Sequence, residues 1–512
     1  MKTLQHHYSV GLAARSEFEE RGIRSSVLTI PAVFRRDETG RDRLPQNYQS
    51  VGAEGVNTLA SKLGLSLFPT QLPFYRLAID PFMERQLVSE FGVEDAAAGR
   101  AEIEKNLALI EETGREAFET QGWRPVMSEC LRHLLITGNG LIMVDKKRGP
   151  QFVDLHKFIC ERDPEGNIIK VVVKQHVARE IAARYFPDGL PEDATRSSEG
   201  DKNLALYSGA CLEENGQFKY WQEVEGVAVP GSLRMLPAKR LPLIPLRFNG
   251  ISGASYGSSF VEEYDGDLIA LEALSRSITE AALAAAKLLI LVKPGASIRA
   301  QTIATSPNGA VKQGNIDDVG VLQMNKALDL SVAQQRAMQI EQRLMRVFLM
   351  ANQRDAERVT AQEVRSTIQE IEDALGGVYS SLAENVQKPI IHYILSQITD
   401  RPDVPKLPKG IEPIIATGLE AISRGHEANR LLTMGQISQQ LLGPQEAAQY
   451  FNPRAILTRV ATSLNLDSDA IIKSEEQIQQ ELEMAQQQQA LSSVAGPAGQ
   501  VLAAQVRQQP QQ

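Results

Sequence analysis

The sequence predicts a predominantly helical α+β fold, and three observations carry that prediction. Apolar residues recur at helical spacing through most of residues 1–150 and again after residue 264. Short β-type runs between hairpin-turn residues fill the intervening 151–250. Of the 512 residues, 43% are hydrophobic and 23% charged, which is typical of globular proteins and excludes collagen, wholesale disorder and a disulfide scaffold. At about 150 residues per domain, this length allows about three to four units.

The charge and the cysteines narrow the function classes. Asp and Glu outnumber Lys and Arg, 63 to 54, and the net charge is −9. Tight DNA binders usually carry a basic domain, because release of counterions from phosphates supplies their affinity. The negative net charge therefore argues against a tight DNA binder, but not against a surface past which DNA slides. Three cysteines without CxxC spacing indicate reduced thiols.

No targeting or membrane segment is expected. The N-terminal residues contain charges and lack the apolar core of a secretory signal. The most apolar run, 281–292, is interrupted by Lys287 and is shorter than the roughly 20 residues that a membrane span needs. We therefore expect a protein that is made and used in a reducing, soluble setting.

Helices and then strands are expected in order along the first half of the chain. Ser50 is the expected N-cap of a helix that runs to Leu67. Helical spacing also covers 102–118 and 126–136. The next hundred residues carry hairpin turns at 163–167 and 215–216, and strands at 152–155, 159–162, 168–173, 218–224 and 243–248.

Two long helices separated by an insertion are expected in the second half. The first helix starts at Asp265 or Asp267 as N-cap and runs to about Leu289. About forty residues rich in Gly, Asn, Thr and Val follow. The second helix starts at a capping box, Ser331–Gln334, and runs to about Ala351.

A third helix is expected to start at another capping box, Thr360–Glu363. A restart so close to the second helix implies a break at 352–359, because a continuous helix needs no new cap. Apolar residues then recur every three or four positions as far as Ile398, and the helix can bend at Gly376–Gly377 and at Pro389.

Two segments resemble cofactor or catalytic motifs. Gly138–Gly140 begins like a dinucleotide fingerprint, but Met143 stands where the third glycine belongs. Gly253–Gly257 reads G-x-S-x-G, and in a serine hydrolase Ser255 would be the nucleophile, with a later histidine as base. Helix and insertion follow it instead of the alternating strands and helices that carry a triad, which favours a plain turn. The histidines have no zinc-site spacing, so neither a metal nor a cofactor is expected.

The helix expected at 331–351 has an apolar face, with Ile340, Leu344, Val347 and Phe348, and a polar face. One interpretation of the polar face is a solvated surface. The other is a wall of sparse positive charge and neutral amides, which would give weak, register-free contact to phosphates. The polar residues are Gln335, Arg336, Gln339, Gln342, Arg343 and Arg346.

Six sequence blocks, in one order across roughly residues 45–430, are more specific than any single motif. They are YQSVGAEGVNTLASKLGLSLFPTQ (48–71), LRHLLITGNGLIMV (131–144), ASYGSSFVEEYDGDL (254–268), AERVTAQEVR (356–365), EIEDALGGVYSSL (370–382) and IEPIIATGLEAISRGHE (411–427). Through them the chain resembles the portal, or head-to-tail connector, proteins of short-tailed bacteriophages. The first forty residues and the tail after about 450 match least.

This resemblance implies the phage portal fold, which assembles into a ring, usually a dodecamer, at one capsid vertex. It also implies that the protein is not an enzyme. The G-x-S-x-G then lies in a block typical of the family, just before the helix that starts near residue 265. Its parts would be a wing at 1–264 (helical to 150, β at 151–250), stem helices at 265–290 and 331–351, a clip at 291–330, a tunnel loop at 352–359, a wing spine helix at 360–398, a crown of shorter helices at 399–475, and a Gln-rich barrel or disordered tail at 476–512.

The resemblance further implies partners and contact residues. Double-stranded DNA would pass through the ring without sequence specificity, and the cations expected to line the channel are Arg336, Arg343, Arg346, Arg354 and Arg358. The two loop arginines could instead pair with Asp355 and Glu357 or between subunits. The terminase large subunit, and later a tail adaptor, would dock on the clip, where the candidate residues are Lys293, Arg299 and Lys312.

Other expected partners are the major capsid, scaffolding and internal core proteins. The expected site is the head–tail junction of the virion, after assembly in the host bacterial cytoplasm. Two rival functions stay open at this point. One is an internal or scaffold-type virion protein that uses the same long helices without a closed ring. The other, more remote, is a serine hydrolase that uses Ser255.

Overall fold

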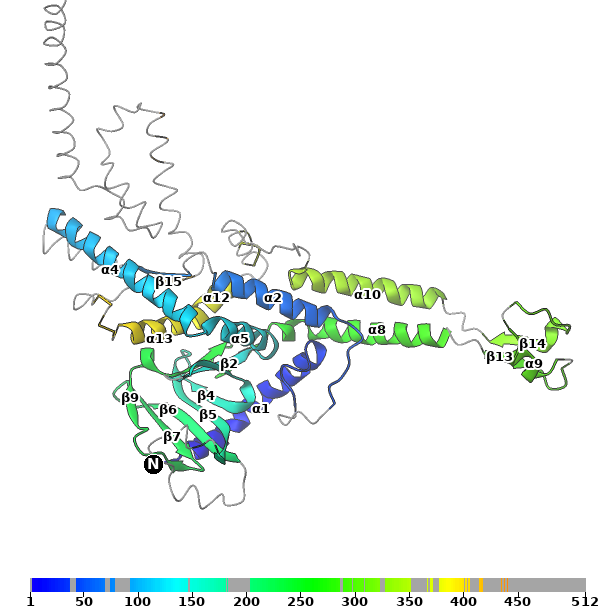
Figure 1. The fold of residues 1–512 in the computed structure, drawn as a ribbon, viewed down its shortest axis with the longest axis horizontal. Helices are drawn as coiled ribbons and strands as arrows, with labels where there is room; N and C mark the ends of the chain where they lie inside the picture. The colour runs from blue at the N-terminus through cyan, green and yellow to red at the C-terminus, as the bar shows by residue number, and fades with distance from the viewer. Residues whose placement is uncertain are drawn as a thin grey trace, which may run out of the picture. The chain divides into compact units, whose positions relative to one another are not determined.

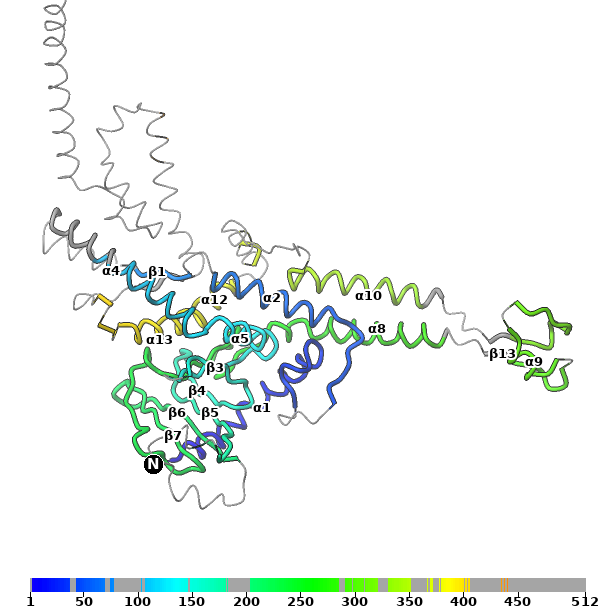
Figure 2. Tube along the Cα trace, viewed as in Figure 1, coloured from blue at the N-terminus to red at the C-terminus, as the bar shows by residue number. Residues whose placement is uncertain are grey.

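The computed structural model divides the chain into two compact units, Met1–Tyr75 with Ile110–Lys406, and Arg76–Leu109 with Leu407–Gln512. Figure 1 shows the described residues in colour, and Figure 2 traces the chain in the same view as a tube. Those residues are 2–36, 43–69, 74–78, 93–145, 148–180, 182, 203–285, 289–296, 298–307, 309–322, 327–350, 366, 369–371, 377–399, 401–402, 404–405, 414–417, 434, 437 and 440.

Four long helices form most of the described N-terminal part: α1 (Leu4–Leu28), α2 (Val51–Leu67), α4 (Val93–Thr120) and α5 (Trp123–Thr137). The predicted helices at 51–67, 102–118 and 126–136 are confirmed. Ser50 precedes α2 but makes no capping hydrogen bond with its side chain. The side chain of Gln49 accepts a hydrogen bond from the first turn of α2 instead, from Gly52 N to its Oε1 at 2.9 Å. Its Nε2 also donates to Leu28 O at 2.7 Å.

Two antiparallel sheets follow. One has the order β10-β2-β3, and the other the order β4-β5-β6-β7-β8, with β9 also paired to β7. The predicted turns are confirmed, with Gly166 and Gly216 at φ 94° and 76°, where an L side chain would be strained. The strands are β2 (Asn139–Asp145), β3 (Gly149–Val153), β4 (Phe158–Arg162), β5 (Ile168–Ala178), β6 (Asn203–Leu212), β7 (Phe218–Val224), β8 (Val227–Ala228), β9 (Arg234–Leu236) and β10 (Leu243–Arg247).

Helix α1 lies along strands β4 to β7 (Figure 1) and closes the core. Its N-terminus meets a buried carboxylate, because Glu223 of β7 accepts from Leu4 N at 2.7 Å and from Gln5 N at 3.3 Å. A negative charge at a helix N-terminus is stabilising. Beneath the helix lies a core cluster of buried residues that includes Ile23, Phe34, Leu141, Val153, Leu155, Phe158, Val171, Val173, Phe218, Leu243 and Tyr256.

Helices α8 (Asp265–Ala285) and α10 (Ala327–Val347) lie side by side (Figure 1). The predicted end of the first helix and both predicted ends of the second need correction, and the second helix ends at Val347 before the expected Ala351. The first helix does not reach Leu289, because this residue begins strand β13 (Leu289–Val292). The second helix does not start at the Ser331–Gln334 box, because the chain is already helical at Ala327 and Ser331 lies inside it. A Ser-x-x-Gln sequence is a local signal and does not prevent helix on its N-terminal side.

Between these helices the chain forms a small unit of its own. Strand β13 pairs antiparallel with β14 (Val319–Leu322), Leu289 facing Leu322, and the short helix α9 (Ala300–Ala304) lies between them in sequence. Strands β11 (Asn249–Gly250) and β12 (Gly257–Ser258), then the 3-10 turn at Val261–Tyr264, lead into α8.

The predicted helix at 360–398 is not continuous. Gly377 has φ 89° and begins helix α12 (Val378–Leu382). A π-turn at Ala383–Gln387 then leads into α13 (Lys388–Ile398), with Pro389 in the first turn. Proline lacks an N–H and clashes with the carbonyl four residues before it, and the wider π-turn accommodates both defects.

In the described part of the C-terminal region, residues 414–417 form a strand where shorter helices were predicted. Strand β15 (Ile414–Thr417) pairs with β1 (Tyr75–Ala78), whose residues 76–78 belong to the same unit as β15. The predicted tunnel loop 352–359 and the tail 476–512 lie outside the described residues, as does nearly all of the predicted crown.

Candidate functional site

The paired helices α8 and α10 join through an apolar seam. Of the predicted apolar face, Ile340 and Leu344 of α10 and Phe348 directly after it are buried, whereas Val347 is half-buried. On α8 the buried apolar residues are Leu268 and Leu271. The seam covers only the parts of the two helices nearest the sheets, because most of the described residues after Arg276 on α8, and most of those before Ala337 on α10, are exposed.

The base of this helix pair is set by close packing at Phe348. Its ring lies 5.6 Å from the ring of Phe260, edge to face, and 6.4 Å from that of Tyr264. A Cβ on Gly55 of α2 would stand 2.5 Å from Phe348 Cγ, so only glycine fits there. This contact fixes α10 against α2.

Polar contacts from α1 fix the start of α8. Arg24 Nε donates to Asp265 Oδ2 at 2.7 Å, and Ser25 Oγ donates to Asp265 Oδ1 at 3.3 Å. Burial raises the pKa of the Asp265 carboxyl, and the hydrogen bond from Arg24 opposes that shift. Asp265 was predicted as an N-cap, but these partners lie some 240 residues away and no local pattern could have indicated them.

The predicted channel arginines on α10 differ in their contacts. Arg343, half-exposed, forms an ion pair with Asp267 of α8 and so ties the two helices together. Arg336 Nη1 donates to Gln339 Oε1 at 3.3 Å, and Arg346 Nε donates to Gln342 O at 3.4 Å, both within α10 and both exposed. Arg354 and Arg358 lie outside the described residues.

None of the residues with described burial in the unit around β13 and β14 is buried, and most are exposed. Its predicted docking residues Lys293, Arg299 and Lys312 are all exposed. It also exposes large apolar side chains, with Val311 96% and Ile316 89% accessible. A two-stranded sheet is marginal on its own in water. This unit and the neighbouring helix ends are therefore a surface that other protein could cover.

The two motif-like segments of the sequence form one structural junction. Asn139 Oδ1 accepts from Gly257 N at 2.7 Å, and Asn139 Nδ2 donates to Gly257 O at 2.9 Å. Ser255 Oγ accepts from Arg162 N at 3.2 Å, and Tyr256 Oη accepts from Cys160 N at 3.1 Å. The G-x-S-x-G segment therefore fastens the loop before α8 to the two sheets.

Comparison with known proteins decides the family. The family described as "Bacteriophage head to tail connecting protein" matches residues 2–472. The chain belongs to this family. Curated relatives include the "Portal protein" of Escherichia phage T7, 32% identical over 97% of this chain and 93% of its own length. Those of Enterobacteria phages T3 and SP6 are 33% and 30% identical, over 91% and 93% of this chain and 87% and 90% of their own lengths.

Membership in the connector family decides between a structural and an enzymatic interpretation of the chain. Connectors are structural proteins of the virion at the head–tail junction, and they are not enzymes. The hydrolase hypothesis for Ser255 is therefore wrong, in agreement with the structural role of this residue. None of the helices in the described part of this connector is long and apolar enough to cross a membrane. Over the same residues, no group of three or more His, Cys, Asp or Glu side chains could hold a metal ion.

Proposed function

We propose that this connector assembles into a closed ring, a dodecamer, at one capsid vertex. Double-stranded DNA passes through the centre of the ring, inward during packaging and outward during ejection. The proposal extends the shown family membership to a specific assembly. In it, residues 1–264 and the spine at 360–398 are the wing, α8 and α10 the stem, the unit around β13 and β14 the clip, 352–359 the tunnel loop, 399–475 the crown and 476–512 the tail.

The observation that carries the ring is the exposed apolar surface of the stem and clip. Leu283 on α8 is 63% exposed and Val332 on α10 is 66% exposed, and the clip residues Val311 and Ile316 are exposed as well. Exposed apolar patches on soluble proteins mark interaction sites. A head-to-tail contact between copies, repeated with a constant rotation, closes into a ring when the rotation returns to the first copy, and otherwise forms an open filament.

The negative net charge of the subunit is compatible with a channel through which DNA moves without binding tightly. A ring of subunits that each carry −9 repels DNA from most of its wall. Few cations would then touch phosphates, which gives weak contact without sequence readout. Arg336 and Arg346 are exposed on the stem, and Arg354 and Arg358 are proposed to act in the tunnel loop as a valve. Arg343 contributes less, because Asp267 already neutralises it.

The clip is the proposed docking surface for the terminase large subunit and, after packaging, for a tail adaptor. Lys293, Arg299 and Lys312 are exposed there and could be recognised by both partners in turn. The wing and crown would contact the major capsid, scaffolding and internal core proteins. Assembly would take place in the host bacterial cytoplasm.

A matched pair of variants tests the ring. Val332→Asp places a charge on the exposed stem surface, and Val10→Asp places one at a similarly exposed position, 64%, on α1. Native mass spectrometry and imaging should find that Val332→Asp lowers the fraction of closed rings while Val10→Asp leaves it unchanged. Equal ring fractions in the two variants would count against the stem as the contact surface.

The valve is tested in virions. Arg354→Ala combined with Arg358→Ala should reduce the DNA content of purified particles, because the loop would lose its contact with phosphates. An unchanged DNA content per particle would exclude this role for the two arginines.

A further inference from the structure

Two arginines at the ends of strands from different sheets lie close together. Arg162 is the last residue of β4, and Arg247 is the last residue of β10. Both side chains are half-buried, and a guanidinium group keeps its positive charge in proteins. Burial lowers the pKa of the Arg247 guanidinium, and the positive charge of Arg162 lowers it further. The two charges are therefore near enough to repel each other.

Both guanidinium groups reach the turn at 163–167, directly after β4. Arg162 Nη1 donates to Gly166 O at 2.9 Å. A Cβ on Gly166 would stand 2.6 Å from Arg247 Nη2, so the backbone of this glycine lies against the second guanidinium. A Cβ on Gly250, just after β10, would stand 3.2 Å from Arg247 Cζ. The two charges thus meet where this turn approaches the chain that runs from β10 towards α8.

The hydrogen bonds that these two side chains donate within the described residues go to neutral oxygens. Besides the bond to the turn, Arg162 Nη2 donates to Pro245 O at 2.9 Å, and Arg247 Nη1 donates to Ala254 O at 3.3 Å. The Nε atoms of both arginines are buried and have no hydrogen-bond partner in the described part of the chain. Carbonyl oxygens satisfy some of the donors but neutralise no charge, and buried donors without an acceptor cost free energy.

The acidic residues nearest in sequence are bound to other groups. Glu161 forms an ion pair with Lys170. Asp163 accepts from Asn167 N at 2.8 Å and from Asn167 Nδ2 at 2.9 Å, and Glu165 accepts from the same Nδ2 at 3.3 Å. Over the described residues, no carboxylate forms an ion pair with either arginine. The pair therefore keeps two positive charges without a counter-ion from the chain.

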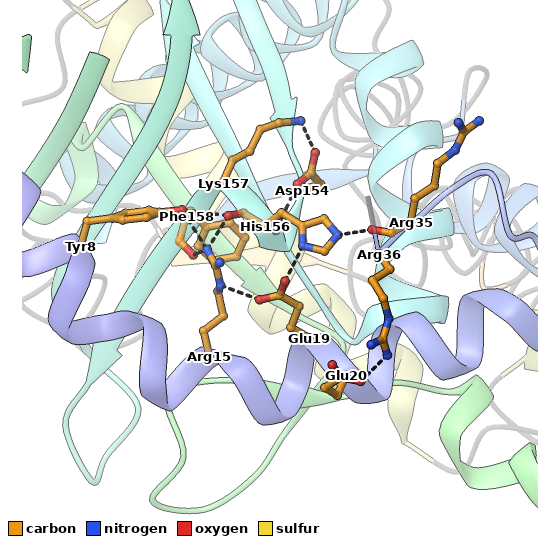
Figure 3. Close-up of polar contacts among 10 residues, drawn as sticks. All are labelled: Tyr8, Arg15, Glu19, Glu20, Arg35, Arg36, Asp154, His156, Lys157 and Phe158. Atoms are coloured by element: carbon orange, nitrogen blue, oxygen red, sulfur yellow. Dashed lines mark hydrogen bonds and ion pairs between the residues drawn. The ribbon is translucent and has the colours of Figure 1, made fainter. Parts of the chain in front are cut away.

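A buried arginine on α1 shows the more usual arrangement (Figure 3). Arg15 also donates to backbone oxygens, those of His156 and Phe158. In addition, Arg15 Nε donates to Glu19 Oε2 at 3.2 Å, so a carboxylate balances its charge. Charges removed from water are normally paired in this way. The two arginines at the ends of β4 and β10 make the bonds to backbone oxygens but lack the carboxylate.

We propose that Arg162 and Arg247 form a binding site for a free, doubly charged oxyanion of the phosphate type. Guanidinium groups bind phosphate oxygens through paired N–H donors, and each has five such donors, more than the backbone oxygens here use. The two charges of the dianion balance those of the arginines. The bound ion removes their repulsion and fastens the turn at 163–167 to residues 249–254, ahead of α8.

Equilibrium dialysis of the full-length protein against radiolabelled inorganic phosphate tests the site, at a mildly alkaline pH where most of the phosphate is doubly charged. Binding should saturate at one phosphate per chain. Sulfate should displace it, and chloride at the same ionic strength should not. Arg247→Gln should weaken binding about ten-fold or more, the effect of one charge-assisted hydrogen bond. Arg234→Gln, which replaces an exposed arginine on β9, should bind as the wild type does.

Substitutions at Gly250 test the site with both arginines in place. Gly250→Asp puts a carboxylate against Arg247, whereas Gly250→Asn has nearly the same shape without the charge. The Asp variant should bind phosphate about ten-fold more weakly than the Asn variant, because its own carboxylate competes for the guanidinium. Circular dichroism identifies the variants that are folded.

Three results would overturn the proposal. They are equal phosphate affinities of Gly250→Asp and Gly250→Asn, wild-type affinity in Arg247→Gln, and a wild type without saturable binding. A short DNA duplex without terminal phosphates separates the free ion from the nucleic-acid backbone, whose phosphodiesters carry one charge each. The duplex should not displace bound phosphate, and displacement would contradict a site for the free dianion.

Discussion

Asn139 and Gly257, 118 residues apart, bind each other twice, through Gly257 N to Asn139 Oδ1 at 2.7 Å and Asn139 Nδ2 to Gly257 O at 2.9 Å. The pair joins the start of β2 to β12, the strand that leads towards α8. The sequence around each residue resembles a different site, a dinucleotide fingerprint and a nucleophile elbow. In the structure both segments fasten the loop before α8 to the sheets.

Replacing Asn139 should therefore destabilise the fold. Asn139→Ala leaves the buried N–H and C=O of Gly257 without these partners, and we expect a loss of about 2–4 kcal/mol in the free energy of unfolding. Urea unfolding followed by circular dichroism measures this loss. Asn57→Ala, at an exposed position on α2, is the control and should change stability by less than about 0.5 kcal/mol. Similar losses in both variants would contradict the proposed junction.

Two glycines of α2 should respond in opposite directions to alanine. A Cβ on Gly55 would collide with Phe348, so Gly55→Ala should cost about 1–3 kcal/mol through overpacking. A Cβ on Gly64 would meet Leu131 Cδ1 at 3.6 Å, an ordinary contact. Gly64→Ala should thus stabilise the helix by about 0.5–1 kcal/mol. Thermal unfolding of the two variants gives the comparison, and a stabilised Gly55→Ala would refute the close approach of α2 and α10.

The free energy of unfolding should depend on pH through His133 of α5. Burial lowers its pKa to about 4, from 6.5 as the ordinary value. Between these values the unfolded chain binds a proton that the folded chain does not, so stability is fully present above pH 6.5 and falls as the pH drops towards 4. The loss from this residue is at most about 3 kcal/mol.

His133→Leu should remove that part of the pH dependence, whatever its effect at pH 7. Urea unfolding at several pH values would show a shallower decline below pH 6.5 than in the wild type. His6→Gln, at an exposed position, should keep the wild-type decline. Parallel curves for the wild type and His133→Leu would show that His133 does not cause the decline.

Exchanging the charges of Arg343 and Asp267 tests the ion pair between them. Arg343→Glu places two carboxylates together and should cost about 1 kcal/mol, since exposed pairs are worth little. Adding Asp267→Arg should restore most of the loss. Arg336→Glu changes an exposed side chain that donates to Gln339 of the same helix, and it should be nearly neutral. Thermal unfolding tests all three, and failure of the double variant to recover would mean that the pair does not join the stem helices.

Local patterns were sufficient for elements that depend on local chemistry. The helix that ends at Leu67 and the turns with Gly166 and Gly216 were predicted because their signals lie in a few neighbouring residues. Capping boxes were less reliable: Ser331 lies inside α10, since a cap sequence does not stop a helix whose upstream residues also favour it. Strand β15 was missed because its partner β1 lies more than 300 residues earlier.

The candidate site was predicted only in part for the same reason. Helical spacing identified Ile340, Leu344 and Phe348 as the buried face of α10 and so left Arg336 and Arg343 on the exposed one. It could not indicate that Arg343 meets Asp267, because that contact depends on the register of α10 against α8. Nor could it indicate that Arg24 holds Asp265, since nothing in either segment reveals the other.

Single-particle imaging of the purified full-length protein tests the central claim most directly. The account predicts a closed ring with one rotational symmetry and a central hole wide enough for a DNA duplex. An open filament, or a compact particle without a hole, would contradict it.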